Sequence, residues 1–391
     1  MALARTYSVA LVGVTGHVVE VEADIANGLV GMILVGLPDT ALREARDRIR
    51  SAILNSGEAW PQRRITVGLS PASLPKRGSW FDLAIAIGVL VADKAVPADA
   101  VDGVMFFGEL GLDGRLRPVR GVLPAVNAAA REGFRTVLVA APNAAEAALV
   151  PHVTVIAASS LTAAADWLRG TPGLHHDVTP AAIFDRDKDR PPDPVPGGPD
   201  LAEVLGQAMA RKGLEICAAG GHHLSLLGPP GAGKTMLAER LPTILPPLAT
   251  ADALDVTSIH SVAGTLPDSG ALVTSAPFLA PHHTASRAAI VGGGTGTIRP
   301  GVASLAHRGV LFLDEAPEFA CDTLDALRQP LESGQITLAR SGTTARFTLV
   351  LPPTPARARK QRARPAAAPA PRLPAAGTWP GCPGRYWTAS M

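Results

Sequence analysis

The sequence predicts two folded domains of mixed α and β structure, an α+β domain and then an α/β domain, followed by a disordered tail. Short Val-rich segments alternate with amphipathic stretches over residues 1–169, which is typical of an α+β domain. Residues 223–240 run from a short apolar segment through a glycine-rich loop into a helical pattern, as in many α/β domains. After residue 351 neither helical nor strand periodicity continues, which predicts disorder.

Composition narrows the class of protein. The 391 residues leave room for two or three domains, and a hydrophobic share of 47% supports real cores. The net charge of +2 favours no class of partner. Three cysteines lie far apart without C-x-x-C spacing, which argues against a disulfide framework and fits a reducing cytoplasm. No apolar run reaches the roughly 18 residues of a membrane helix, so we expect a cytoplasmic protein without a membrane partner.

The first domain is predicted to span residues 1–169. The Asp113-Gly114 pair predicts a tight hairpin turn, and Asp39 stands where it can cap a helix. The expected elements, in chain order, are a strand pair at residues 8–14 and 17–22, helices at 39–55 and 81–91, a hairpin of 104–110 with 115–118, and a strand at 137–140.

Three further segments follow. Residues 170–199 contain paired histidines, a charge run and many Pro and Gly residues, which predicts a linker. Residues 200–351 form the predicted second domain. Residues 352–391 are rich in Pro, Ala and Arg and predict a disordered tail, with a basic nucleic-acid-binding arm as the functional alternative.

The glycine-rich loop is the most informative motif of the chain. It fits the pattern G-x-x-x-x-G-K-[ST] at every fixed position. Backbone N–H groups hold a polyphosphate in such loops, because glycine lets the backbone come close. The pattern assigns Lys234 to the β- and γ-phosphates and the Thr235 hydroxyl to Mg²⁺. The predicted nucleotide-binding residues are Gly228, Pro229, Pro230, Gly231, Ala232, Gly233, Lys234 and Thr235.

A second motif, Val310-Leu311-Phe312-Leu313-Asp314-Glu315, is an apolar run that ends in two acids. A buried strand ending in this way can place one carboxylate on Mg²⁺ and the next beside the attacking water. We therefore predict Asp314 as a metal ligand with Thr235, and Glu315 as the general base. Together with Lys234, the two acids predict the catalytic core of an ATP hydrolase.

Two features between and after these motifs leave alternatives open. His282 and His283 can ligate metal, but no acid or cysteine follows at a ligand spacing, which favours loop histidines with backbone hydrogen bonds. Residues 335–340 and 345–351 alternate like strands around Ser341-Gly342, which predicts a hairpin.

The second domain resembles the AAA+ ATPases of the magnesium-chelatase-like ComM/YifB family. The resemblance rests on the two motifs above and on other short segments of the same domain. Those segments are Asp200-Leu201-Ala202-Glu203-Val204-Leu205-Gly206-Gln207, Ala280-Pro281-His282-His283-Thr284, Leu305-Ala306-His307-Arg308-Gly309 and Ala316-Pro317-Glu318-Phe319. In the first domain it rests on Val35-Gly36-Leu37-Pro38-Asp39, Leu74-Pro75-Lys76-Arg77-Gly78 and Gly108-Glu109-Leu110-Gly111-Leu112.

The resemblance covers about residues 1–351. It implies ATP and Mg²⁺ as cofactors and a homo-oligomeric, hexameric ring. It also implies motion on branched or single-stranded DNA, as in branch migration during recombination or transformation. A rival reading is a magnesium-chelatase-type ATPase subunit for metal insertion, although no residues indicate a porphyrin site. A second rival is a non-enzymatic remnant.

The first domain also resembles the Lon protease fold, of the ribosomal S5 domain 2-like type. Matching Pro75-Lys76-Arg77-Gly78 to the Lon signature puts Trp80 where the nucleophilic Ser would stand, with Ser79 one place off. Matching residues 114–118 puts Leu123 where the Lys would stand. Neither side chain can act as nucleophile or base, so the resemblance implies a catalytically dead domain.

The chain departs from the family after Leu351. The family pattern continues Leu-Ala-Ala-Asn-Pro-Cys-Pro-Cys, in which the Asn is the sensor that orients the hydrolytic water. This chain reads Leu-Pro-Pro-Thr-Pro-Ala-Arg-Ala over residues 351–358. GC-rich codons for the family's amino-acid sequence encode these same residues once a single nucleotide is deleted after the Leu codon. We therefore expect that a frameshift truncates the family's sequence after Leu351. The AAA+ domain would then be incomplete, without the sensor Asn, the arginine finger and the lid. We expect such a chain to hydrolyse ATP weakly.

Overall fold

The computed structural model describes residues 2–36, 40–76, 78–171, 176–178, 199–229, 231–266, 271–293, 299–338, 341–352 and 386–390. Contacts divide the chain into two compact units. The first comprises Met1–Arg190 with Thr257–Leu272, and the second comprises Pro191–Val256 with Val273–Met391. Both units are mixed α/β structures, as the sequence predicts. Most of the predicted linker lies outside the described residues.

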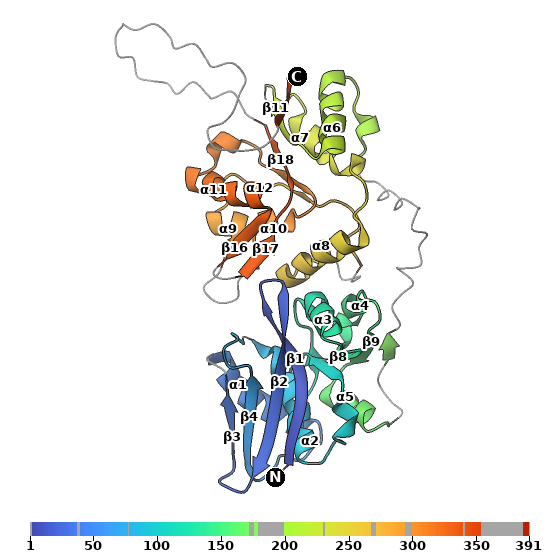
Figure 1. Cartoon of the computed structure of the whole chain (residues 1–391), viewed down its shortest axis with the longest axis vertical. Coiled ribbons are helices and arrows are strands. Elements are labelled where there is room, and N and C mark those ends of the chain that lie inside the picture. The colour runs from blue at the N-terminus through green and yellow to red at the C-terminus, as the bar shows by residue number, and fades with distance from the viewer. Residues whose placement is uncertain are drawn as a thin grey trace, which may run out of the picture. The chain divides into compact units, whose positions relative to one another are not determined.

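The first unit is built on an eight-stranded mixed sheet in the order β10-β9-β8-β5-β1-β2-β4-β3. The long strands β1 and β2 form an antiparallel hairpin at its centre (Figure 1). The strands are β1 (Ala2–Val12), β2 (Thr15–Ala26), β3 (Gly31–Val35), β4 (Arg64–Ser70), β5 (Val104–Phe107), β8 (Thr136–Ala140), β9 (Thr154–Ala158) and β10 (His176–Val178). A short hairpin of β6 (Glu109–Leu110) and β7 (Leu116–Arg117) confirms the predicted Asp-Gly turn.

Helices pack on this sheet and complete its core. Helix α2 is buried at every residue, which explains why it has no polar face in the sequence. Its predicted range of 81–91 is confirmed within a residue, as is the predicted helix that becomes α1. The helices of the unit are α1 (Thr40–Asn55), α2 (Asp82–Ala92), α3 (Val122–Arg131), α4 (Ala144–Ala147) and α5 (Leu161–Leu168).

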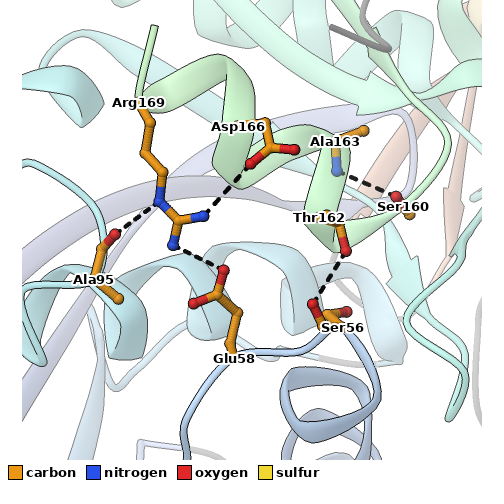
Figure 2. Close-up of polar contacts among 8 residues, drawn as sticks. All are labelled: Ser56, Glu58, Ala95, Ser160, Thr162, Ala163, Asp166 and Arg169. Carbon is orange, nitrogen blue, oxygen red and sulfur yellow. Dashed lines mark hydrogen bonds and ion pairs between the residues drawn. The ribbon is translucent and has the colours of Figure 1, made fainter. Parts of the chain in front are cut away.

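Side-chain hydrogen bonds stabilise both ends of helix α5 (Figure 2). At the amino end the Ser160 hydroxyl accepts a hydrogen bond from the Ala163 N–H at 3.1 Å, an N-cap. At the carboxyl end the Arg169 guanidinium donates to the Ala95 carbonyl at 2.9 Å and to Glu58 at 2.8 Å. Because these partners follow α1 and α2, the arginine joins three helices at the end of the predicted first domain.

The second unit has a five-stranded sheet in the order β12-β15-β18-β11-β19, and every neighbouring pair in it is parallel. Apolar side chains line both faces, since one cluster contains Val310, Phe312 and Val350 and another contains Leu311 and Leu349. Such two-sided burial is typical of parallel sheets. The strands are β11 (His223–Leu227), β12 (Phe278–Leu279), β15 (Val310–Phe312), β18 (Thr348–Leu351) and β19 (Tyr386–Ser390).

Helices cover the two faces of this sheet. Residues of α6 and α7 pack into one apolar cluster, and residues of α9 and α10 pack into the other (Figure 1). The helices of the unit are α6 (Ala208–Gly220), α7 (Lys234–Glu239), α9 (Arg287–Val291), α10 (Val302–Leu305), α11 (Cys321–Ala326) and α12 (Arg328–Ser333). Helix α8 (Thr250–Ala263) begins in this unit, and its residues from Thr257 on belong to the first unit. Within the described ranges no helix is long and apolar enough to cross a membrane.

Two expectations for the end of the chain are corrected. The predicted hairpin exists, but β16 (Gln335–Leu338) pairs with β17 (Ser341–Thr344), and Thr348–Leu351 joins the central sheet as β18. Ser341 and Gly342, predicted as the turn, therefore belong to a strand, and residues 339–340 between the two strands lie outside the described residues. Two small strands, β13 (Gly292–Gly293) and β14 (Arg299–Pro300), form a separate pair.

The expectation of disorder throughout residues 352–391 is wrong for Tyr386–Ser390. These residues form β19 along the outer side of β11, with His223 opposite Tyr386 and Leu227 opposite Ser390. An edge strand offers unpaired N–H and C=O groups, and Tyr, Trp and Thr are strong strand formers. Residues 353–385 lie outside the described residues.

Candidate functional site

The glycine-rich loop connects β11 to α7, as the sequence predicts. Gly231 and Gly233 both have φ of +79°, a left-handed conformation that favours glycine. A Cβ on Gly233 would come within 3.1 Å of the Met236 methyl and 3.2 Å of the Gln207 amide nitrogen. The left-handed backbone therefore favours glycine at both positions. At Gly233, a side chain would also be close to Met236 and Gln207. Pro230 lies outside the described residues.

Lys234 begins α7 and folds back over the loop. Its side chain is buried, and Nζ donates to the carbonyl oxygens of Gly228 at 3.0 Å and Pro229 at 2.9 Å. An ammonium group has three donors, so these two carbonyls hold it above the loop. The lysine is thus positioned by the loop backbone itself.

Thr235 and Asp314 come together from distant parts of the sequence. The Thr235 hydroxyl lies 3.4 Å from Asp314 Oδ2. Asp314 follows β15 closely, and only β18 separates β15 from β11 in the sheet. Because the carboxyl ends of parallel strands meet at one edge, the two predicted motifs converge there. Asp314 Oδ1 also accepts the Glu315 backbone N–H at 3.0 Å.

Glu315 has an unusual backbone and an unexpected partner. Its φ is +51°, a left-handed conformation that few non-glycine residues adopt. Its carboxylate oxygen Oε2 lies 3.3 Å from His283 Nδ1. Sequence reasoning interpreted His283 as a loop histidine with backbone hydrogen bonds and missed this contact. The adjacency of β12 and β15 was the missing information, since it brings the segments after both strands together.

A glutamine was also missed as part of the loop's support. Gln207 precedes α6, has φ of +49°, and donates from its side-chain amide to the Ala232 carbonyl at 3.0 Å. It therefore fixes the peptide beside Gly233. The sequence contains one indication of this role, because Gly206-Gln207 belongs to the segment at residues 200–207 that resembles the family.

The site offers oxygen ligands of the kind that a hard cation prefers. Among the described residues no group of three or more His, Cys, Asp or Glu side chains is arranged to hold a metal ion. Mg²⁺ in phosphate-binding sites typically takes one or two protein carboxylates and completes its shell with phosphate and water oxygens. The Thr235 hydroxyl and the Asp314 carboxylate fit that mode of binding.

Two histidines, the buried His307 and the half-buried His223, bind the backbone of the segment that contains β18. His307 Nδ1 accepts the Arg346 N–H and His223 Nδ1 accepts the Leu349 N–H, each at 3.0 Å. Burial, and then the positive charge of Arg308, lower the pKa of His307 to about 4. Burial also lowers the pKa of His223. Both rings are therefore neutral acceptors at pH 7, which these backbone hydrogen bonds require.

In the first unit, the positions matched to protease catalytic residues are packing positions. Leu123 is fully buried in α3, and the Trp80 ring contacts Phe107 edge-on at 6.0 Å between centroids. The Ser79 hydroxyl donates to Glu109. Lys76 is also fully buried, and its ammonium donates to backbone carbonyls, among them Gly36 at 3.3 Å. The neighbouring Arg77 lies outside the described residues.

Comparison with known families identifies the class of protein. The family described as "Magnesium chelatase, subunit ChlI" matches residues 200–368. The family described as "Subunit ChlI of Mg-chelatase" matches residues 21–143. Fold, site and these two matches together define a magnesium-chelatase-like protein.

Individual relatives narrow the assignment. An uncharacterized protein of Mycobacterium tuberculosis is 52% identical over 359 residues, which cover 91% of this chain and 69% of the relative. The uncharacterized protein YifB of Escherichia coli is 43% identical over 90% of this chain and 67% of its own length. The competence protein ComM of Haemophilus influenzae is 43% identical over 90% of this chain and 68% of its own length. The chain belongs to the ComM/YifB family of magnesium-chelatase-like proteins.

Proposed function

We propose that the chain binds ATP with Mg²⁺ at the glycine-rich loop and is built as an AAA+ motor that acts on DNA. The observation that carries the proposal is the meeting of Lys234, Thr235 and Asp314 at one edge of a parallel sheet. Membership of the magnesium-chelatase-like family supports an ATPase role. The printed name of the ComM relative, a competence protein, supports a role connected with DNA in transformation.

Each residue has a distinct part in the proposed reaction. The loop backbone, freed of Cβ atoms at Gly231 and Gly233, holds the phosphates through its N–H groups. Lys234 neutralises charge on the β- and γ-phosphates. Thr235 and Asp314 hold Mg²⁺, which supplies further charge neutralisation when bound. Glu315 orients and deprotonates the attacking water. In this proposal, the groups that bind the phosphates and Mg²⁺ and that deprotonate the water belong to residues 228–235 and 314–315.

The remaining assignments of the proposal follow the family resemblance. Residues 1–169 form a Lon-like, S5 domain 2-like scaffold, supported by the packing roles of Trp80 and Leu123. Residues 170–199 connect it to an AAA+ core at residues 200–351. We also propose a hexameric ring and a cytoplasmic location, where ATP and DNA are both present.

We further propose that hydrolysis is impaired in this chain. The amino-acid sequence after Leu351 differs from the family pattern, and deletion of one nucleotide from the coding sequence would produce this difference. The sensor Asn of the family pattern would then be missing from its place after Leu351, so one group that orients the attacking water would be lost. Resequencing the gene through codon 351 tests this, because a confirmed open frame without a frame-shifted family remnant downstream contradicts it.

ATP hydrolysis with and without DNA tests the motor itself. We expect slow hydrolysis by this chain and faster hydrolysis, stimulated by branched DNA, once the reading frame is restored. A chelatase-type subunit, which the matched family description favours, would instead respond to a metal-inserting partner complex and ignore DNA. A restored protein that neither binds nor hydrolyses ATP would contradict the proposal and favour a non-enzymatic remnant.

A further inference from the structure

The strand β19 covers the last residues of β11 before the glycine-rich loop. On one side of β11, the parallel pairing with β18 ends at Ser225. On the other side, the parallel pairing with β19 continues to Leu227, which lies opposite Ser390. Within the part of the chain that the structure describes, Leu226 and Leu227 therefore have strand partners only in β19. Gly228, the first residue of the loop, follows them directly.

The end of β11 leads into the carbonyl groups that hold Lys234. The Lys234 ammonium donates to the carbonyl oxygens of Gly228 at 3.0 Å and Pro229 at 2.9 Å, the two residues that follow the strand. The Leu226 side chain is fully buried, whereas Leu227 is exposed. Side-chain burial therefore fixes the strand only as far as Leu226, and backbone pairing with β19 extends one residue further.

The strand β19 comes from the part of the chain that departs from the family pattern. β18 ends at Leu351 and β19 begins at Tyr386. Parallel strands of one sheet need a connection of a dozen or more residues, and residues 352–385 are long enough for one. Tyr386-Trp387-Thr388 are residues that favour strands, in contrast to the Pro-, Ala- and Arg-rich sequence before them. The tail can therefore supply an edge strand, whichever reading frame encodes it.

We propose that β19 positions the end of β11 for nucleotide binding, so that phosphate binding by the glycine-rich loop depends on residues 386–390. The inference rests on the proposed function, because it gives the same nucleotide site a support from the tail. Without β19, the outer backbone groups of β11 lose their strand partners, and the end of β11 frays. The carbonyl groups of Gly228 and Pro229 then no longer hold Lys234 in one place.

Amide hydrogen exchange of the full chain without nucleotide tests whether β19 holds β11. Successive N–H groups of a strand point to opposite sides, so Trp387→Pro together with Thr388→Pro removes the one of the two that faces β11. We expect a peptide that contains β11 to exchange about fivefold to tenfold faster in this double variant. Thr378→Pro with Trp379→Pro, the same two changes outside β19, should exchange like the wild type. Unchanged exchange of β11 in the first double variant overturns the proposal.

A peptide that contains β15 shows whether the sheet survives the change. Because β18 separates β15 from β11, we expect the exchange of β15 to stay as in the wild type. If β15 also exchanges faster, the milder pair Trp387→Gly with Thr388→Gly takes the place of the prolines, since it lowers strand propensity and keeps the N–H groups. Equal acceleration of β11 and β15 in both double variants overturns the proposal, because β19 would then support the whole sheet.

Binding of a fluorescent ATP analogue with Mg²⁺ tests the link to the nucleotide site. We expect the affinity to be about tenfold weaker in Trp387→Pro with Thr388→Pro and unchanged in the control pair. Because coupling between two sites is reciprocal, the bound analogue should also slow the exchange of a wild-type peptide that contains β19. Faster exchange of β11 with unchanged affinity overturns the proposal. Failure of the wild type to bind the analogue contradicts the proposed function instead, and the exchange of β11 still decides whether β19 holds the strand.

Discussion

The hydroxyl of Thr235 lies 3.4 Å from the carboxylate of Asp314, although 79 positions separate the two residues in the sequence. A hydroxyl and a carboxylate at this separation can share one hard cation. The pair belongs to two motifs that the sequence identifies independently, one at the glycine-rich loop and one after β15. Their meeting is the structural basis for assigning the metal to this edge of the sheet.

Removing either ligand should weaken the Mg²⁺ dependence of nucleotide binding. In the wild type we expect Mg²⁺ to tighten binding of an ATP analogue. In Thr235→Ala and Asp314→Asn we expect most of that gain to be lost, about tenfold in affinity, because a charged ligand or an oxygen donor is missing. Asp322→Asn, an exposed acid of α11, is the control. Titrations with and without Mg²⁺ check the prediction, and equal gains in all four proteins would refute the metal assignment.

Stability of the second unit should fall in mild acid because of His307. Its pKa is lowered from the ordinary 6.5 to about 4 in the folded chain. Between these values the unfolded chain binds more protons, so the stabilisation is complete above pH 6.5 and is lost as the pH falls toward 4. The full effect is about 3 kcal/mol. The groups that act on the ring are Arg308, Asp252 and Arg346.

Amide exchange of a peptide that contains β18 measures this effect locally. Protection should decline from pH 7 to pH 4.5 after correction for intrinsic exchange rates. His307→Asn, which keeps an acceptor for the Arg346 N–H, should show a shallower decline, with His223 responsible for part of what remains. Identical pH profiles for wild type and variant would rule out His307 as the cause.

The buried pair of Arg48 and Asp82 should be essential for the first unit. Arg48 donates to both carboxylate oxygens of Asp82, at 2.6 and 3.0 Å, and Asp82 is fully buried. Burial raises the pKa of Asp82 to about 6 despite this arginine. Arg48→Ala leaves a buried carboxylate without its partner, so we expect a loss of about 3 kcal/mol in the free energy of unfolding.

Urea unfolding followed by tryptophan fluorescence can measure that loss, since three of the five tryptophans, Trp60, Trp80 and Trp167, belong to the first unit. Arg63→Ala is the matched control, because the Arg63–Asp93 pair has an arginine side chain that is 51% exposed. We expect this variant to lose less than about 1 kcal/mol. Similar losses in both variants would show that burial does not distinguish the two pairs.

The sequence identifies those parts of the site that depend on local pattern. The strand, glycine-rich loop and helix from β11 to α7 follow one another in the chain, so their order and the role of Gly233 can be predicted from a short segment. The buried helix α2 is equally evident, because every residue in it except Asp82 is apolar or glycine.

Features that depend on strand order could not be predicted. His283 meets Glu315 only because β12 lies beside β15, and no local pattern states which strands are neighbours. The split of residues 341–351 between β17 and β18 has the same origin, since the apolar stretch Thr348–Leu351 could join a hairpin or the central sheet. Gln207 was equally hidden, because its contact with Ala232 depends on how α6 packs beside the loop.

Binding of a fluorescent ATP analogue to Lys234→Ala tests the central claim most directly, because it needs neither hydrolysis nor DNA. The wild-type chain should bind the analogue, and the variant should bind about tenfold to a hundredfold more weakly, as expected for losing charge-assisted hydrogen bonds to phosphate. Lys212→Ala, which removes an exposed lysine of α6, should bind like the wild type. Equal affinity in Lys234→Ala and the wild type would contradict an ATP site at the glycine-rich loop.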